Sequence, residues 1–89
     1  MCGIAGIIDL SNNTISTKNV HLMVSKLERR GPDHKSVLQL PNAVLGHSRL
    51  SILDLSKAGN QPMSSNNNRY TITYNGEIYN HKKLRFKLE

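Results

Sequence analysis

A single cysteine, Cys2, stands among the 89 residues of this chain, so no disulfide can form within it. A chain of this length buries only about two-thirds of the surface that its unfolded form exposes. The cysteine and the four histidines show none of the pair spacings that are typical of a zinc site. We therefore expect no metal, and a fold that depends on an ordinary apolar core or on a larger domain of which this chain is a part.

The apolar run at the start of the chain is short, ends at Asp9 and has no basic residues before it. These features fit neither a secretory signal peptide nor a membrane span. We expect a cytoplasmic protein without a membrane partner, and a lone reduced cysteine agrees with that compartment.

The net charge is +6 and the isoelectric point is about 9.8, which alone would allow nucleic-acid binding. The basic residues are dispersed, however, and only residues 26–30 and 82–87 form small clusters. Aromatic residues of the kind that stack on single-stranded bases are nearly absent. Solvated helix faces are the better interpretation of this charge, and we expect no nucleic-acid partner.

The first half of the chain predicts a strand, a helix and two further strands. Residues 3–8 form an apolar run without helical period, which indicates a strand. A turn at 11–13 and a cap at Ser16 or Thr17 precede an amphipathic helix whose apolar face is Val20, Met23, Val24 and Leu27. Gly31-Pro32 ends that helix, and strands at 36–40 and 43–50 follow, joined by a tight turn at Pro41-Asn42.

The second half is less regular. Residues 54–69 are polar and rich in turn formers, and residues 70–74 alternate as a strand. Asn75-Gly76 is a strong hairpin signal that predicts a short strand after it, and Asn80 can cap a final helix. Because the strands are grouped, the layout predicts an α+β fold with a mostly antiparallel sheet. The chain stops within its last helix, so we expect an incomplete, N-terminal portion of a domain.

Cys2 is the leading candidate for chemistry. Its small side chain allows removal of Met1, which would leave a thiol and a free α-amine on one residue. The α-amine titrates near pH 8, so a useful fraction is neutral and can take the thiol proton. A small apolar residue at the start of a strand is the plainer interpretation of Cys2 taken alone.

Two further features suggest a substrate pocket. Asn75 and Gly76 could supply a side-chain amide and a backbone N–H to an oxyanion, although a hairpin turn is the simpler account of this pair. Arg49 precedes a loop and could bind a carboxylate with two hydrogen bonds, although a surface salt bridge is the more common role of an arginine judged alone. With Glu77 on an α-ammonium group, the set describes a pocket for glutamine.

Five ordered segments resemble the glutaminase domain of class II glutamine amidotransferases. They are MCGIAGIID, RRGPD, HSRLSILDL, QPM and YNGEIYNH, and they cover nearly the whole chain. The last three look most like asparagine synthetases of the glutamine-hydrolysing type. The resemblance implies a four-layer αββα sandwich of the N-terminal-nucleophile type, with residues 1–89 as one partial type 2 glutamine amidotransferase domain that continues beyond this chain.

The resemblance also implies site residues at matching positions. Cys2 matches the nucleophile, Arg49 the carboxylate-binding residue, and Asn75 and Gly76 the oxyanion hole. Glu77 lies beside the glutamine amino group, and the segment that lines the site is Leu50, Ser51, Ile52 and Leu53. A Gly-Ser-Asp segment that the family places after the last helix is not part of these 89 residues. We therefore expect the isolated piece to be inactive.

The expected partners are L-glutamine and a synthetase domain of the same parent chain, and a homodimer is an open alternative. The expected cofactors are none in this piece, with ATP and Mg in that synthetase domain. The alternatives are an amidotransferase that acts on another carboxylate, and a non-catalytic module that has kept the fold.

Overall fold

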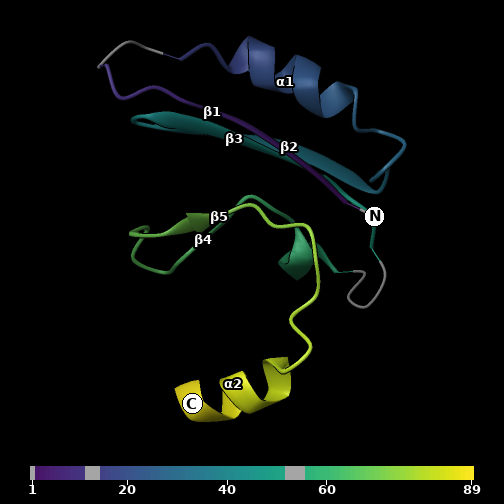
Figure 1. Cartoon of the computed structure of the whole chain (residues 1–89), viewed down its shortest axis with the longest axis vertical. Coiled ribbons are helices and arrows are strands. Elements are labelled where there is room, and N and C mark those ends of the chain that lie inside the picture. Colours follow the sequence, from purple (N-terminus) through teal and green to yellow (C-terminus); the bar gives the residue numbers. More distant parts are fainter. Residues whose placement is uncertain (1, 12–14, 52–55) are drawn as a thin grey trace.

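The structure is a computed structural model that describes residues 2–11, 15–51 and 56–89 (Figure 1). The elements follow in the order β1 (Gly3–Ile8), α1 (Thr17–Ser25), β2 (His34–Leu40), β3 (Ala43–Arg49), the 3-10 turn η1 (Lys57–Gly59), β4 (Met63–Ser64), β5 (Thr71–Ile72) and α2 (His81–Leu88). The predicted turn at 11–13 falls largely outside the described residues. Neither helix of the described ranges is long and apolar enough to cross a membrane.

The central feature is a three-stranded antiparallel sheet in the order β1-β3-β2. Leu40 pairs with Ala43, so Pro41 and Asn42 form the predicted two-residue connection between β2 and β3. On the other side of β3, Gly3 pairs with Ser48. The expected α+β class and the mostly antiparallel strand arrangement are confirmed.

The core lies between α1 and one face of this sheet. Val20 and Val24 of α1 are buried against Val44 of β3. Gly46 permits this close approach, because a Cβ at that position would lie 2.4 Å from a methyl carbon of Val24. The predicted apolar face of the helix is correct at two positions only. Met23 is 39% exposed, since it points away from the sheet-facing stripe.

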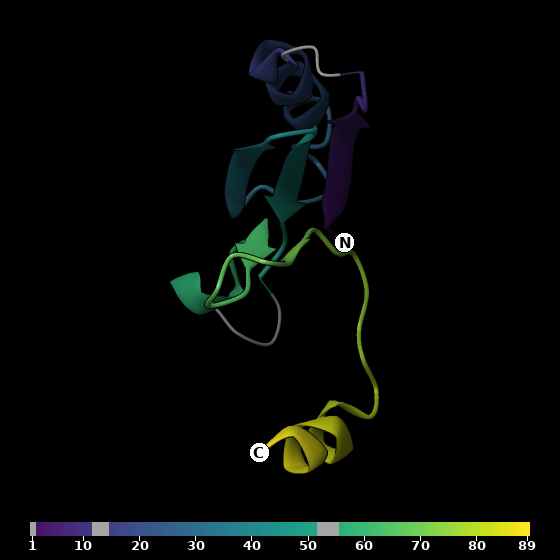
Figure 2. The same cartoon turned by 90° about the vertical axis from the view of Figure 1, so that its left-hand side faces the viewer.

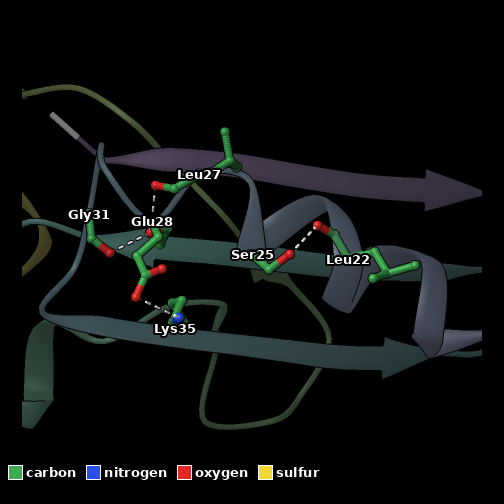
Figure 3. Close-up of polar contacts among 7 residues, drawn as sticks. Leu22, Ser25, Leu27, Glu28, Gly31 and Lys35 are labelled. Atoms are coloured by element: carbon green, nitrogen blue, oxygen red, sulfur yellow. Dashed lines mark hydrogen bonds and ion pairs between the residues drawn. The ribbon is translucent and has the colours of Figure 1, made fainter.

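Polar contacts hold the chain after α1 on the sheet (Figure 3). The Ser48 hydroxyl of β3 donates to the carbonyl oxygen of Leu27 at 3.1 Å and also to that of Gly31. Lys35 of β2 forms an exposed ion pair with Glu28 at 3.4 Å. The helix ends at Ser25, so Leu27 lies in the following turn rather than on the helix face as predicted.

The opposite face of the sheet carries β4, β5 and η1. Figures 1 and 2 show α1 on one side of the three-stranded sheet and the β4–β5 pair on the other. Met63 pairs with Ile72 in this small antiparallel ladder. In the described part of the chain, the three-stranded sheet thus lies between helix α1 and a second, short sheet.

The hairpin lies elsewhere than the sequence predicts. The strand expected at 70–74 is only Thr71–Ile72, and its partner is β4, inside the segment that was expected to be irregular. The connecting turn is closed by the Ser65 amide, which donates to the Tyr70 carbonyl at 2.9 Å, and Asn68 adopts a left-handed φ of 56°. The prediction of a hairpin at Asn75-Gly76 is wrong, because the strand before this pair finds its partner upstream.

The final helix α2 begins after Asn80, as predicted, although the Asn80 side chain makes no capping hydrogen bond. All of its residues are exposed, and Leu84 and Leu88, expected on one apolar face, are 40% and 87% exposed. Figures 1 and 2 show α2 at the end of an extended segment, away from both sheets.

Candidate functional site

Cys2 lies beside the C-terminal end of β3. Because β1 and β3 are antiparallel, the start of β1 lies next to the end of β3. The Leu50 amide donates to Cys2 Sγ at 3.3 Å, and the thiol faces the Leu50 carbonyl oxygen at 3.7 Å. Arg30 Nε donates to the Cys2 carbonyl oxygen at 3.3 Å. These contacts fix the backbone and the sulfur of the half-buried Cys2. They place it against Leu50, the residue that follows Arg49.

Arg49 is the last residue of β3 and is only 7% exposed. Its Nη1 donates to the Ser56 carbonyl oxygen at 2.6 Å and to Asn60 Oδ1 at 2.8 Å. Gly59 lies directly against the guanidinium, since a Cβ there would be 2.3 Å from Nη2. The guanidinium is therefore held in one orientation in a largely dry place, which suits recognition of a carboxylate better than a surface salt bridge.

Asp33 fixes the segment that follows β3. Its Oδ2 accepts a hydrogen bond from the Ser51 amide at 2.7 Å, and its own amide donates to the Arg49 carbonyl oxygen at 2.9 Å. The Leu50 backbone thus contacts Cys2, and Asp33 holds the Ser51 backbone that follows it. Ile52 and Leu53, the other two expected residues, lie outside the described residues.

Asn75, Gly76 and Glu77 follow Tyr74 in an extended segment. The Tyr74 amide donates to Gln61 Oε1 at 2.6 Å, and the Tyr74 carbonyl oxygen lies 3.0 Å from His47 Nε2. The contacts of Cys2 and Arg49 given above do not include these three residues. The structure therefore places the expected nucleophile against Leu50, which follows the expected carboxylate-binding residue Arg49. It also ties the Asn75 segment to β3 through the contact of Tyr74 with His47.

His47 had no predicted role beyond being one of four scattered histidines. It is fully buried on the same face of β3 as Arg49. Burial lowers the pKa of His47 below its ordinary value, and the positive charges of Arg49 and His34 lower it further. The hydrogen bond to Tyr74 opposes this shift. The imidazole is thus neutral near pH 7. The sequence does not predict Tyr74 as its partner, because the two residues are 27 positions apart and meet only in the folded structure.

Within the ranges that the structure describes, no group of three or more His, Cys, Asp or Glu side chains is arranged to hold a metal ion. The described residues at this site supply a thiol, a guanidinium and backbone hydrogen-bond donors.

Comparison with known proteins places this site in a family. The whole chain, residues 1–89, matches the family described as "Glutamine amidotransferase domain". Asparagine synthetase B [glutamine-hydrolyzing] of Escherichia coli is 41% identical over 86 residues, which cover 96% of this chain and 15% of that protein. Asparagine synthetase [glutamine-hydrolyzing] 3 of Bacillus subtilis is 38% identical over 91 residues, covering 99% of this chain and 15% of that protein. The asparagine synthetase [glutamine-hydrolyzing] of Asparagus officinalis is 37% identical over 89 residues, covering 99% and 15%.

An antiparallel sheet with a helix on one face and a cysteine at the start of its first strand is consistent with a domain of the N-terminal-nucleophile type. The chain belongs to the glutamine amidotransferase domain family. It spans about 15% of the length of the relatives it matches, and it aligns with their glutamine amidotransferase part.

Proposed function

We propose that this chain is the N-terminal part of the glutaminase half of an asparagine synthase (glutamine-hydrolysing), with Cys2 as the nucleophile. One observation carries the proposal: the Cys2 sulfur lies 3.3 Å from the backbone amide of Leu50, the residue that follows the buried Arg49. A thiol beside the end of the strand that carries a buried guanidinium suits a substrate with an α-carboxylate at one end and an amide at the other. The names of the relatives, which are glutamine-hydrolysing asparagine synthetases, support glutamine as that substrate.

In this proposal glutamine is held at both ends of its amino-acid group. Arg49 binds the α-carboxylate, and Glu77 faces the α-ammonium. The segment of Leu50, Ser51, Ile52 and Leu53 lines the pocket, and Asp33 keeps the Ser51 amide in place. Together these contacts direct the side-chain amide toward Cys2.

The reaction begins after removal of Met1 leaves Cys2 with a free α-amine. The amine takes the thiol proton, and the sulfur attacks the amide carbon of glutamine. The oxyanion is stabilised by the Asn75 side chain and the Gly76 amide. The C–N bond breaks, and the α-ammonium returns its proton to the leaving ammonia. Water then attacks the γ-glutamyl thioester, releases glutamate and restores the thiol.

We further propose that the complete domain is a four-layer αββα sandwich, of which α1, the three-stranded sheet and the β4–β5 pair are the beginning. In the complete protein, ammonia would amidate aspartate in a synthetase domain that uses ATP and Mg, in the cytoplasm. A measurement of the oligomeric state of the complete protein in solution would test whether it is a homodimer.

The test is intact-mass analysis of the full-length protein after incubation with diazo-oxo-norleucine, a glutamine-like electrophile. We expect loss of Met1 and one adduct, which Cys2→Ala abolishes and excess glutamine slows. The matched control is Ser11→Ala, since Ser11 is exposed and follows the end of β1 that lies away from Cys2. A protein that keeps Met1, or that stays unlabelled, would overturn the proposal. The isolated 89-residue piece is expected to show no glutaminase turnover.

A further inference from the structure

His47 is a buried polar side chain that the proposed reaction does not use. It lies two residues before Arg49 in β3 and pairs with Ile4 of β1 and Ser36 of β2. Its side chain is 0% exposed. A buried imidazole in a small protein requires a reason, because a polar group without a full set of hydrogen bonds costs free energy.

The hydrogen bond to Tyr74 fixes the tautomer of this imidazole. A carbonyl oxygen can only accept, so Nε2, which lies 3.0 Å from the Tyr74 oxygen, carries the proton. In the neutral ring Nδ1 then carries a lone pair. Nδ1 is buried and finds no hydrogen-bond partner among the described residues. Only one of the two ring nitrogens of His47 therefore has a hydrogen-bond partner among the described residues. That nitrogen, Nε2, binds the Tyr74 carbonyl oxygen.

The peptide that His47 holds is the one that leads into Asn75. The Tyr74 carbonyl and the Asn75 amide belong to the same planar peptide group, so a fixed carbonyl direction also fixes the direction of the Asn75 N–H. The strand β5 ends at Ile72, so no ladder extends to this peptide. Among the described residues, this segment is hydrogen-bonded to β3 through His47 and through the Thr73 hydroxyl, which donates to the Gly46 carbonyl oxygen at 3.1 Å.

The same strand also positions the other parts of the site. Arg49 is two residues after His47 on the same face of β3, and Leu50, which contacts Cys2, follows directly. His47 therefore connects the strand that carries the substrate-binding end of the site to the segment that carries Asn75 and Gly76.

We propose that His47 is a positioning residue that sets the orientation of the Tyr74–Asn75 peptide, and with it the placement of Asn75 and Gly76 as oxyanion donors. The inference rests on the proposed function, because it assigns a role in glutamine hydrolysis. His47 does not exchange protons with the substrate and does not touch it. It acts through Tyr74.

Two variants separate this role from simple filling of space. In His47→Gln the amide Nε2 is as many bonds from Cβ as the imidazole Nε2, so it can still donate to Tyr74. In His47→Asn the amide is one bond shorter and cannot reach that oxygen. A misplacement of about 1 Å at a reacting centre can cost roughly 100-fold in rate. We therefore expect His47→Asn to lose about 100-fold in kcat, with KM for glutamine little changed, and His47→Gln to restore most of the loss.

The experiment measures kcat and KM for glutamine hydrolysis by the full-length protein, together with the thermal midpoint of each variant. His21→Asn is the matched control, since His21 is an exposed histidine of α1. A wild-type kcat in His47→Asn would overturn the proposal, and so would an equal loss of kcat in folded His47→Asn and His47→Gln. If His47→Asn does not fold, a folded His47→Gln decides: wild-type kcat supports the role, and a lost kcat contradicts it.

A failure of the proposed function would look different. In that case the wild-type protein would not hydrolyse glutamine, and Cys2→Ala would change nothing. An active wild-type protein whose kcat is indifferent to His47→Asn would leave the proposed function intact and refute only the role of His47.

Discussion

Gly59→Ala tests whether the orientation of Arg49 matters for substrate binding. No glycine in the described residues has a positive φ, so alanine at position 59 introduces no backbone strain. The new Cβ would instead lie 2.3 Å from Arg49 Nη2 and 2.8 Å from Cζ. The substitution therefore acts on the guanidinium through a single methyl group.

The size of the effect follows from this geometry. Ordinary van der Waals contact begins near 3.4 Å, so the guanidinium must withdraw by about 1 Å. Its hydrogen bonds to the Ser56 carbonyl and to Asn60 hold it where it is, so withdrawal disturbs them as well. A hydrogen bond to a charged group contributes about 1.5–3 kcal/mol. Loss of one such contact to the glutamine carboxylate corresponds to a decrease of roughly 10- to 150-fold in kcat/KM.

Steady-state kinetics of glutamine hydrolysis by the full-length protein measure this prediction. We expect the decrease to appear as a higher KM with a nearly constant kcat, because the carboxylate contact is made equally in the ground state and in the transition state. Ala58→Ser is the matched control, since Ala58 is the exposed neighbour in the same turn. An unchanged KM in Gly59→Ala, with an unchanged thermal midpoint, would refute the assignment of Arg49 as the carboxylate-binding residue.

Three further predictions concern catalysis, the core and pH. Asn75→Ala should lower kcat for glutamine hydrolysis by about 100- to 1,000-fold, as loss of an oxyanion donor does, and an unchanged kcat would contradict that role. Val20→Ala should lower the free energy of unfolding by about 2 kcal/mol, seen as a lower urea midpoint, whereas Met23→Ala, at a partly exposed position, should change it by under about 0.5 kcal/mol. Equal effects would place the core elsewhere. Because the folded-state pKa of His47 lies below its ordinary value of 6.5, the unfolded chain takes up the proton first. Stability should therefore be complete above about pH 6.5 and fall as the pH drops below it, and His47→Gln should reduce that fall in a thermal-midpoint series.

The strands of the three-stranded sheet were predictable because each is read from local pattern. The apolar run of β1 and the Pro41-Asn42 connection between β2 and β3 require no knowledge of the rest of the chain. Local pattern predicts a hairpin at Asn75-Gly76, and this prediction is wrong. Its local hairpin preference is real, but a two-residue turn forms only when a strand follows to pair with β5. In this chain β5 pairs instead with β4, which precedes it in the sequence. The residues around β4 are polar, so β4 is a strand because it pairs with β5 and not because of its composition.

The sequence singles out candidate site residues, but it does not predict the contacts that support them. Cys2 and Arg49 are singled out by their chemistry and by resemblance, and both lie at the C-terminal end of β3, where Cys2 contacts Leu50. The contacts of Arg49 with Ser56 and Asn60 could not be foreseen, because a carbonyl and an amide in a turn-rich loop carry no signal of their own. The same is true of His47, whose partner is a backbone oxygen that has no identity in the sequence.

The strand β3 makes the fold and the site interdependent. Its even-numbered residues serve the fold: Gly46 lies against α1, and Ser48 donates to the turn after α1. On the other face, His47 contacts Tyr74 and Arg49 contacts Ser56 and Asn60, and both residues belong to the proposed site. Because side chains alternate strictly along a strand, a slip of one residue in the pairing with β1 would place the site residues against α1. It would also move Cys2 away from Leu50. The burial of the small α1 core therefore sets the register that holds Cys2, the proposed nucleophile, against Leu50. Variants that weaken this core should therefore reduce glutamine hydrolysis even though they touch no substrate.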